Sequence, residues 1–184
     1  MHMLNGFDGL FHLHEPTTPT IMSANVSRLL KKIFPTASIS GGYFKLTLPE
    51  SFTPLAGECY YNVAKMIRDN GGGEPVLGWM IWESLTMIEG EAHCLYKSLE
   101  GEVLDITPRV SGEETIFFVP DLRVHPSLEH ISGTKFKMYQ NTNPKLANNY
   151  EKFEPSQRVE LDFEQSEIRV IKLVDYQDSF LFEK

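Results

Sequence analysis

Hydrophobic residues recur every three or four positions in two stretches of the chain, which is the spacing of one buried helical face. In the first stretch, Val26, Leu29 and Ile33 share such a face. Ser23 precedes them and can cap a helix start, while Pro35 follows and cannot continue a helix. The pattern therefore predicts a helix between Ser23 and Pro35.

The second stretch begins at a cysteine. Val63, Met66 and Ile67 are spaced for one face of a helix that runs on from Cys59. Residues 70–73, Asn-Gly-Gly-Gly, end it, because asparagine and glycine tolerate the left-handed cap conformation. Cys59 is thus expected in the first turn of a helix or just before it.

Strand-like segments follow. Residues 75–88 (PVLGWMIWESLTMI) and 91–108 (EAHCLYKSLEGEVLDITP) are rich in Val, Ile, Trp and Tyr, and predict two or three antiparallel strands. A tight turn is expected at residues 99–102. Residues 43–49 (YFKLTLP) and 115–121 (TIFFVPD) predict two more strands. Helices first and sheet second predict an α+β fold with an antiparallel sheet.

The remaining segments carry weaker patterns. Residues 125–131 (HPSLEHI) predict a short helix, residues 144–153 a weak helix, and residues 163–176 a final strand. Residues 1–20, with their glycines, prolines and threonines, predict a loosely ordered start. The length of 184 residues otherwise indicates a single domain, 1–184, without repeats.

Composition narrows the classes of partner and location. The chain has 25 acidic and 17 basic residues and a net charge of -8, which argues against nucleic acid or an anionic membrane as a partner. No apolar run reaches the roughly 18 residues of a membrane span, and no basic leader precedes an apolar block. Two cysteines are not a disulfide framework. These features predict a cytoplasmic protein, with export by a leaderless route left open.

Three residues occur in an order that suits nucleophilic catalysis. Cys59 opens a helix, where partial positive charge favours a thiolate. His93, on a later strand, can hold and return a proton, and Asp105, on the next strand, can fix the tautomer of that histidine. The backbone N–H of Cys59 can help to bind an oxyanion.

Regular strand pairing does not bring Asp105 to His93. A turn centred between Glu100 and Gly101 pairs residues whose numbers sum to about 201. Asp105 then lies opposite residue 96, and His93 lies opposite residue 108. A longer turn or a bulge would change this register.

The residues at 57–72 (GECYYNVAKMIRDNGG), 75–79 (PVLGW) and 91–108 resemble the core of transglutaminase-like proteins, in the papain-like cysteine hydrolase superfamily. They are also similar to N-terminal glutamine amidohydrolases. The resemblance covers residues 56–108, a catalytic-like core. It implies a helix that carries the cysteine, packed on an antiparallel sheet that carries the histidine and aspartate. Cys59 would match the nucleophile, His93 the base and Asp105 the orienting carboxylate.

This resemblance implies a cysteine-dependent hydrolase that acts on an amide of a protein or peptide substrate. Hydrolysis, deamidation and transglutaminase-like acyl transfer all proceed through a thioester, without a cofactor. An alternative is an inactive binding module on the same scaffold. Papain-type peptidases often carry an oxyanion-hole glutamine before the cysteine, and residues 51–58 contain none; Glu58 instead places a carboxylate beside the thiol.

Aromatic residues are candidates for substrate contacts. Trp79 and Trp82 are three positions apart and face opposite sides of an extended strand, so one is expected in the core and the other at a substrate cleft. Tyr60 follows the thiol directly and can shape the same cleft or pack. Cys94 alternates with His93 and is expected in the core.

The cysteine and histidine side chains could instead bind a metal ion. A zinc set would need Cys59, His93 and Cys94 together with His12 or His14. The spacing has no C-x-x-C or H-x-x-x-H pair, and adjacent strand residues point to opposite faces. We therefore expect no metal.

Overall fold

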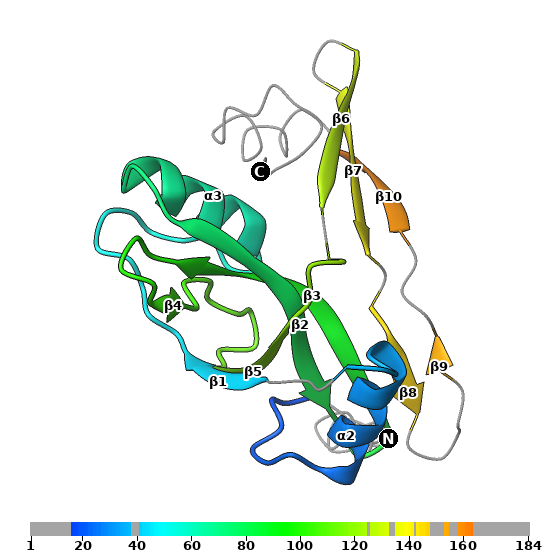
Figure 1. Ribbon diagram of the computed structural model, residues 1–184. Helices are drawn as coiled ribbons and strands as arrows, with labels where there is room; N and C mark the ends of the chain where they lie inside the picture. Colours follow the sequence, from blue (N-terminus) through cyan, green and yellow to red (C-terminus); the bar gives the residue numbers. More distant parts are fainter. Residues whose placement is uncertain are drawn as a thin grey trace, which may run out of the picture.

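The computed structural model describes residues 16–37, 41–124, 126–132, 135–141, 143–147, 153–154 and 158–163. These residues form an α+β arrangement in which all strand pairs are antiparallel (Figure 1). The larger sheet runs in the order β1-β5-β2-β3-β8-β9, with β4 paired to β3, and a smaller sheet has the order β10-β7-β6. The expected α+β class with an antiparallel sheet is confirmed.

The strands of the larger sheet are β1 (Gly42–Lys45), β2 (Glu74–Glu83), β3 (Met87–Lys97), β4 (Val103–Leu104), β5 (Thr115–Pro120), β8 (Lys145–Ala147) and β9 (Phe153–Glu154). Those of the smaller sheet are β6 (Ser127–Ser132), β7 (Lys135–Asn141) and β10 (Arg158–Phe163).

The first helix, α2 (Ala24–Ile33), forms as its periodicity predicts. Ser23 is its N-cap, and the Ser23 hydroxyl accepts a hydrogen bond of 3.1 Å from the Val26 N–H. The Ser23 hydroxyl also donates to Glu83 at the end of β2, which fixes the helix start on the sheet.

The second helix, α3 (Cys59–Asp69), begins at the cysteine itself. Gly57 has a φ of 77°, a left-handed conformation in which glycine turns the chain just before the helix. Gly71, with a φ of 68°, follows the helix end. The expected place of Cys59 in the first turn is confirmed.

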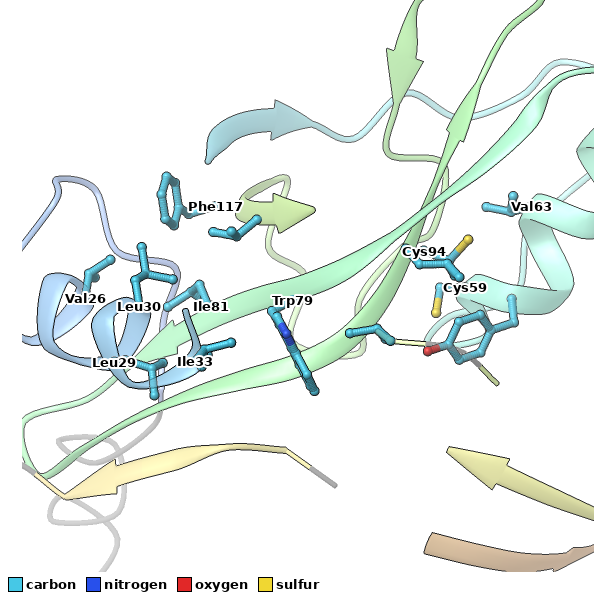
Figure 2. Packing of buried hydrophobic residues seen from close by; sticks show 14 of the residues in the cluster. Val26, Leu29, Leu30, Ile33, Cys59, Val63, Trp79, Ile81, Cys94 and Phe117 are labelled. Carbon is cyan, nitrogen blue, oxygen red and sulfur yellow. The ribbon is translucent and has the colours of Figure 1, made fainter. Parts of the chain in front are cut away.

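Both helices pack on the same face of the sheet. One hydrophobic cluster joins the apolar faces of α2 and α3 to alternate residues of β2, β3 and β5, and in Figure 2 Trp79 lies between the α2 side and the α3 side of this cluster. A second cluster on the opposite face contains Met80, Trp82, Leu95, Ile116 and Phe118. The two clusters leave β2 and β3 buried on both faces, which accounts for their long apolar runs.

Two sequence predictions in the later part of the chain are wrong. The helix expected at residues 125–131 is strand β6, and the weak helix at 144–153 is replaced at Lys145–Ala147 by strand β8. Pairing with β7 and β3 supplies the backbone hydrogen bonds, and such pairing overrides weak local preference. The expected strand at 163–176 lies outside the described residues, except for Phe163 in β10, as do residues 1–15 of the loosely ordered start.

Among the described residues, neither helix is long and apolar enough to cross a membrane.

Candidate active site

Cys59 lies at the tip of α3, held by the loop before it. The N–H of Gly57 donates to the carbonyl of Pro108 over 2.9 Å, which ties this loop to the segment after β4. The Cys59 side chain is almost buried, with 6% of its surface exposed. Glu58, the residue before it, is exposed to solvent.

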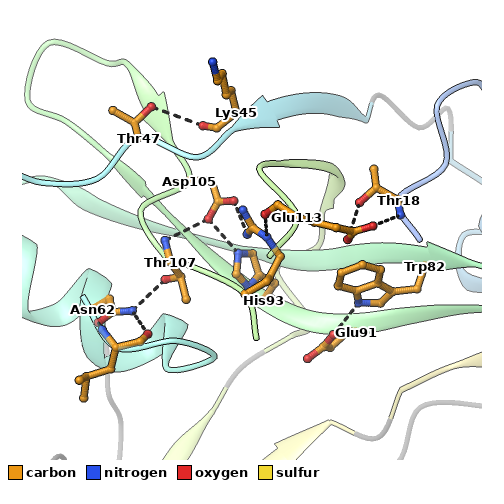
Figure 3. A network of polar contacts seen from close by, with 12 residues as sticks. Thr18, Lys45, Thr47, Asn62, Trp82, Glu91, His93, Asp105, Thr107 and Glu113 are labelled. Carbon is orange, nitrogen blue, oxygen red and sulfur yellow. Dashed lines mark hydrogen bonds and ion pairs between the residues drawn. The ribbon is translucent and has the colours of Figure 1, made fainter. Parts of the chain in front are cut away.

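Asn62, on α3, holds this loop through buried hydrogen bonds. Its side chain is fully buried and exchanges two hydrogen bonds with the backbone of Leu55, of 2.9 and 2.8 Å. Its amide also donates to the hydroxyl of Thr107 over 3.1 Å (Figure 3). Asn62 is thus a buried hydrogen-bonding residue and not part of the polar surface. One buried amide therefore connects α3, the loop before Cys59 and the segment that carries Asp105.

His93 lies at a gap in the strand pairing along one edge of β3. On the side away from β2, β8 pairs with residues 87–89 of β3 and β4 pairs with residues 96–97. His93 lies between these two pairings, where no described strand covers β3. Its imidazole is 4% exposed and makes an edge-to-face contact with Phe118, with ring centroids 6.2 Å apart.

Asp105 reaches His93 because β4 ends early. The β3–β4 register pairs Tyr96 with Leu104, so a continued strand would place Asp105 opposite Leu95. Instead the chain leaves β3 after Leu104, and Asp105 forms a parallel bridge with Leu46. Its carboxylate Oδ1 then lies 3.3 Å from Nε2 of His93 (Figure 3).

The carboxylate of Asp105 is fully buried and has three partners. Oδ1 also accepts from the Thr107 N–H over 3.2 Å, and Oδ2 accepts from Nη1 of Arg109 over 2.5 Å. Burial opposes ionisation, but the hydrogen bond to His93 and the charges of His93 and Arg109 outweigh it, so that the pKa of Asp105 is lowered. Asp105 is therefore a carboxylate whose charge is shared between a histidine and an arginine.

His93 lies near both other members of the expected set. Burial disfavours its charged form, but the charge of Cys59, followed by hydrogen bonds to Asp105 and to Cys59, raises the pKa of His93 to about 9. The structure thus places Asp105 within hydrogen-bond distance of His93, and Cys59 near enough to the same ring to raise its pKa. Such an arrangement can hold a thiolate beside an imidazolium in a site with little solvent.

The three aromatic candidates have different surroundings. Trp79 is 2% exposed, lies in the core, and donates from its indole to Asp121 over 2.8 Å. Tyr60 packs in the same cluster; burial, and then the charge of Cys59, raise its pKa well above the usual value. Both leave little surface for a substrate.

Trp82 lies on the opposite face, as its spacing from Trp79 predicts, and lines a hollow of about 280 Å³. Its indole donates to Glu91, two residues from His93 on the same face of β3 (Figure 3). Trp82 is therefore the aromatic candidate beside open space. A larger hollow, of about 560 Å³, lies among residues 17–20, 113–115 and Tyr43, and contains none of the predicted site residues.

Cys94 is fully buried in the core, as expected from its alternation with His93. Burial, and then the charge of Cys59, raise the pKa of the Cys94 thiol well above its usual value. Among the described residues no group of three or more Cys, His, Asp or Glu side chains is arranged to hold a metal ion.

Neither Arg109 nor the linking role of Asn62 is indicated by the sequence pattern. Arg109 follows Asp105 by four residues in an irregular segment, where spacing alone does not indicate contact. Asn62 has no flanking pattern that distinguishes it from a surface residue.

Comparisons of the chain with protein-family models, with curated proteins and with solved structures find no match.

Proposed function

We propose that this protein is a cysteine-dependent hydrolase that acts on an amide, either a peptide bond or a glutamine-type carboxamide. The observation that supports the proposal is the hydrogen-bond distance of 3.3 Å between His93 and Asp105, beside a Cys59 whose charge raises the pKa of His93. A buried histidine with this pair of partners is expected to stay protonated beside a thiolate, which is the resting state of an activated cysteine. The resemblance of residues 56–108 to transglutaminase-like proteins supports the same chemistry.

In the first step, the Cys59 thiolate attacks the carbonyl carbon of the amide and a C–S bond forms. The N–H of Cys59 is a candidate donor to the oxyanion, since the first turn of a helix leaves backbone N–H groups without acceptors inside the helix. His93 passes its proton to the departing nitrogen, the C–N bond breaks, and ammonia or an amine leaves. A thioester on Cys59 remains.

In the second step, water attacks the thioester and His93 takes one of its protons. The C–S bond breaks, a carboxylic acid leaves, and the thiolate–imidazolium pair is restored. A primary amine in place of water would give acyl transfer. Asp105 keeps the His93 ring oriented through Nε2, which leaves Nδ1 for Cys59 and the reacting groups.

The proposal is tested by thiol reactivity and by turnover in a Cys94→Ala background. We expect a haloacetamide to label Cys59 rapidly at pH 7, and His93→Ala to slow this labelling by about tenfold or more. Ammonia release from glutamine-containing peptides then measures deamidation, with Cys59→Ser as the inactive control. Slow labelling that is identical with and without His93 would contradict the proposal.

The low exposure of Cys59 and His93 favours a second candidate, an inactive module that binds a peptide or a partner protein. This candidate predicts that Cys59→Ala leaves any biological effect of the protein intact. Loss of that effect in a folded Cys59→Ala variant would exclude it.

A further inference from the structure

Arg109 is a buried cation on the far side of Asp105 from His93. Its side chain is 5% exposed. Nη1 donates to Oδ2 of Asp105, and Nε donates to the backbone carbonyl of Glu113 over 2.7 Å. The carboxylate of Glu113 is itself engaged with Thr18, through the Thr18 N–H at 3.0 Å and the Thr18 hydroxyl at 3.3 Å. Arg109 is therefore fixed in place with its charge directed at Asp105.

Stability alone does not explain this arrangement. Nη2 of Arg109 is buried and has no acceptor among the described residues. A buried donor left unsatisfied costs free energy, and buried ion pairs are often no more stabilising than apolar side chains of similar size. The position of the charge beside Asp105 therefore calls for another role.

The titratable and charged groups near His93 lie on three parts of the chain. They are Cys59 and Tyr60 on α3, Glu91 and Cys94 on β3, and Asp105, Arg109 and Glu113 after β4.

We propose that Arg109 is a positioning residue that neutralises Asp105, so that the His93 imidazolium needs the Cys59 thiolate as its counter-ion. With Arg109 present, the two positive charges of His93 and Arg109 balance the two negative charges of Asp105 and Cys59. Without Arg109, the His93 imidazolium is already balanced by Asp105, and the Cys59 thiolate loses one of the two positive charges that offset it. Arg109 thus acts on the nucleophile through Asp105 and His93, without touching the substrate.

This inference rests on the proposed function, because it assumes that the ionised Cys59–His93 pair is the working state. The probe is the rate at which iodoacetamide alkylates Cys59, measured from pH 4 to 10 in the full chain carrying Cys94→Ala. This readout needs no substrate. The variants are Arg109→Gln, which removes the charge, and Arg109→Lys, which keeps it. Arg68→Gln removes the same charge from an exposed position on α3 and is the matched control.

We expect Arg109→Gln to move the acid limb of the alkylation profile upward by about one pH unit or more, because a charge at this range in a buried site acts strongly. Arg109→Lys should restore the limb to within about half a unit of the parent, and Arg68→Gln should leave it unchanged. An acid limb that stays in place in folded Arg109→Gln would overturn the inference.

Arg109→Gln leaves Asp105 with a single charged partner and can fail to fold. The double variant Asp105→Asn/Arg109→Gln removes both charges and keeps the test open. We expect its acid limb to lie within about half a pH unit of the parent, because the two removed charges act on Cys59 in opposite directions. A displacement of about one unit or more in the double variant would overturn the inference.

The two proposals fail in different ways. If His93→Ala leaves the parent profile unchanged, Cys59 and His93 are not coupled and the proposed function fails. If His93→Ala changes the profile but the Arg109 variants do not, only the role of Arg109 is wrong.

Discussion

The carboxylate Oδ1 of Asp105 lies 3.3 Å from Nε2 of His93, although strand pairing would set Asp105 opposite Leu95. The contact exists because β4 has only two residues and the chain then turns toward β1, where the backbone carbonyl of Asp105 accepts from the Thr47 N–H over 2.8 Å. A longer β4 would separate the two side chains. The short strand is therefore the feature that assembles this half of the site.

Replacement of Asp105 by asparagine tests the orienting role. We expect Asp105→Asn to lower amide turnover by about 10²- to 10⁴-fold, because the amide neither holds the tautomer nor stabilises the imidazolium of His93. Iodoacetamide should still alkylate Cys59, with an acid limb at lower pH, since one negative charge has been removed. Steady-state kinetics and the alkylation profile measure the two effects. Unchanged turnover would show that Asp105 serves the fold alone.

The stability of the protein should depend on the ionisation of His93. The pKa of His93 is raised to about 9 in the folded chain, against about 6.5 for an unfolded histidine. Such a group stabilises the fold fully below pH 6.5 and loses this contribution as the pH rises through 9. We expect the free energy of unfolding in urea to fall between pH 6.5 and 9 by more in the parent than in His93→Gln. Equal slopes would contradict the raised pKa.

The charge of Cys59 is the leading cause that raises the pKa of His93. In Cys59→Ala, nuclear magnetic resonance titration of His93 should therefore give a pKa clearly below that of the parent. The Cys94→Ala variant is the matched control, because the Cys94 side chain lies on the face of β3 opposite to His93. It should leave the pKa of His93 unchanged. A His93 pKa that is the same in Cys59→Ala and the parent would argue against the thiolate–imidazolium pair.

The side chain of Asn62 should contribute strongly to stability, because it makes three hydrogen bonds. Asn62→Ala removes three hydrogen bonds and leaves the N–H and carbonyl of Leu55 without their partner. We expect a loss of about 2–4 kcal/mol in the free energy of unfolding. Thr107→Val removes only one of these bonds and should cost about 1 kcal/mol. Urea denaturation measures both, and equal losses would contradict the linking role of Asn62.

Gly78 makes room for the Phe118 ring beside His93. Gly78 pairs with His93 across β2 and β3, and a Cβ at this position would lie 2.2 Å from the Val119 carbonyl oxygen and 2.6 Å from Cζ of Phe118. We expect Gly78→Ala to cost about 1–3 kcal/mol in the free energy of unfolding and to slow Cys59 alkylation, since the backbone cannot move away cheaply.

Gly101→Ala is the control for this substitution. Gly101 has a φ of 89° and open space where a Cβ would lie, so its replacement adds backbone strain of about 1 kcal/mol without a clash. It should leave Cys59 alkylation unchanged. A slower alkylation in Gly101→Ala, to the same degree as in Gly78→Ala, would show that general destabilisation explains the effect.

The sequence by itself determined the local elements near the site. The 3.6-residue spacing after Ser23 and after Cys59 specified α2 and α3, because one apolar face must be buried and the caps mark where each helix starts or stops. Alternation around His93 and Cys94 placed one side chain toward each face of β3. Such patterns are readable because they depend only on neighbours in the chain.

Only the tertiary structure decided which side chains meet. The irregular segment after β4 carries Asp105, Thr107 and Arg109. Its course relative to β1 and α3 decides that Asp105 meets His93, that Arg109 pairs with Asp105, and that Asn62 bonds to Thr107. Strand β6 likewise replaced an expected helix because its pairing with β7 outweighed its local preference. Contacts of this kind arise from long-range pairing and burial, which leave no periodic pattern in the sequence.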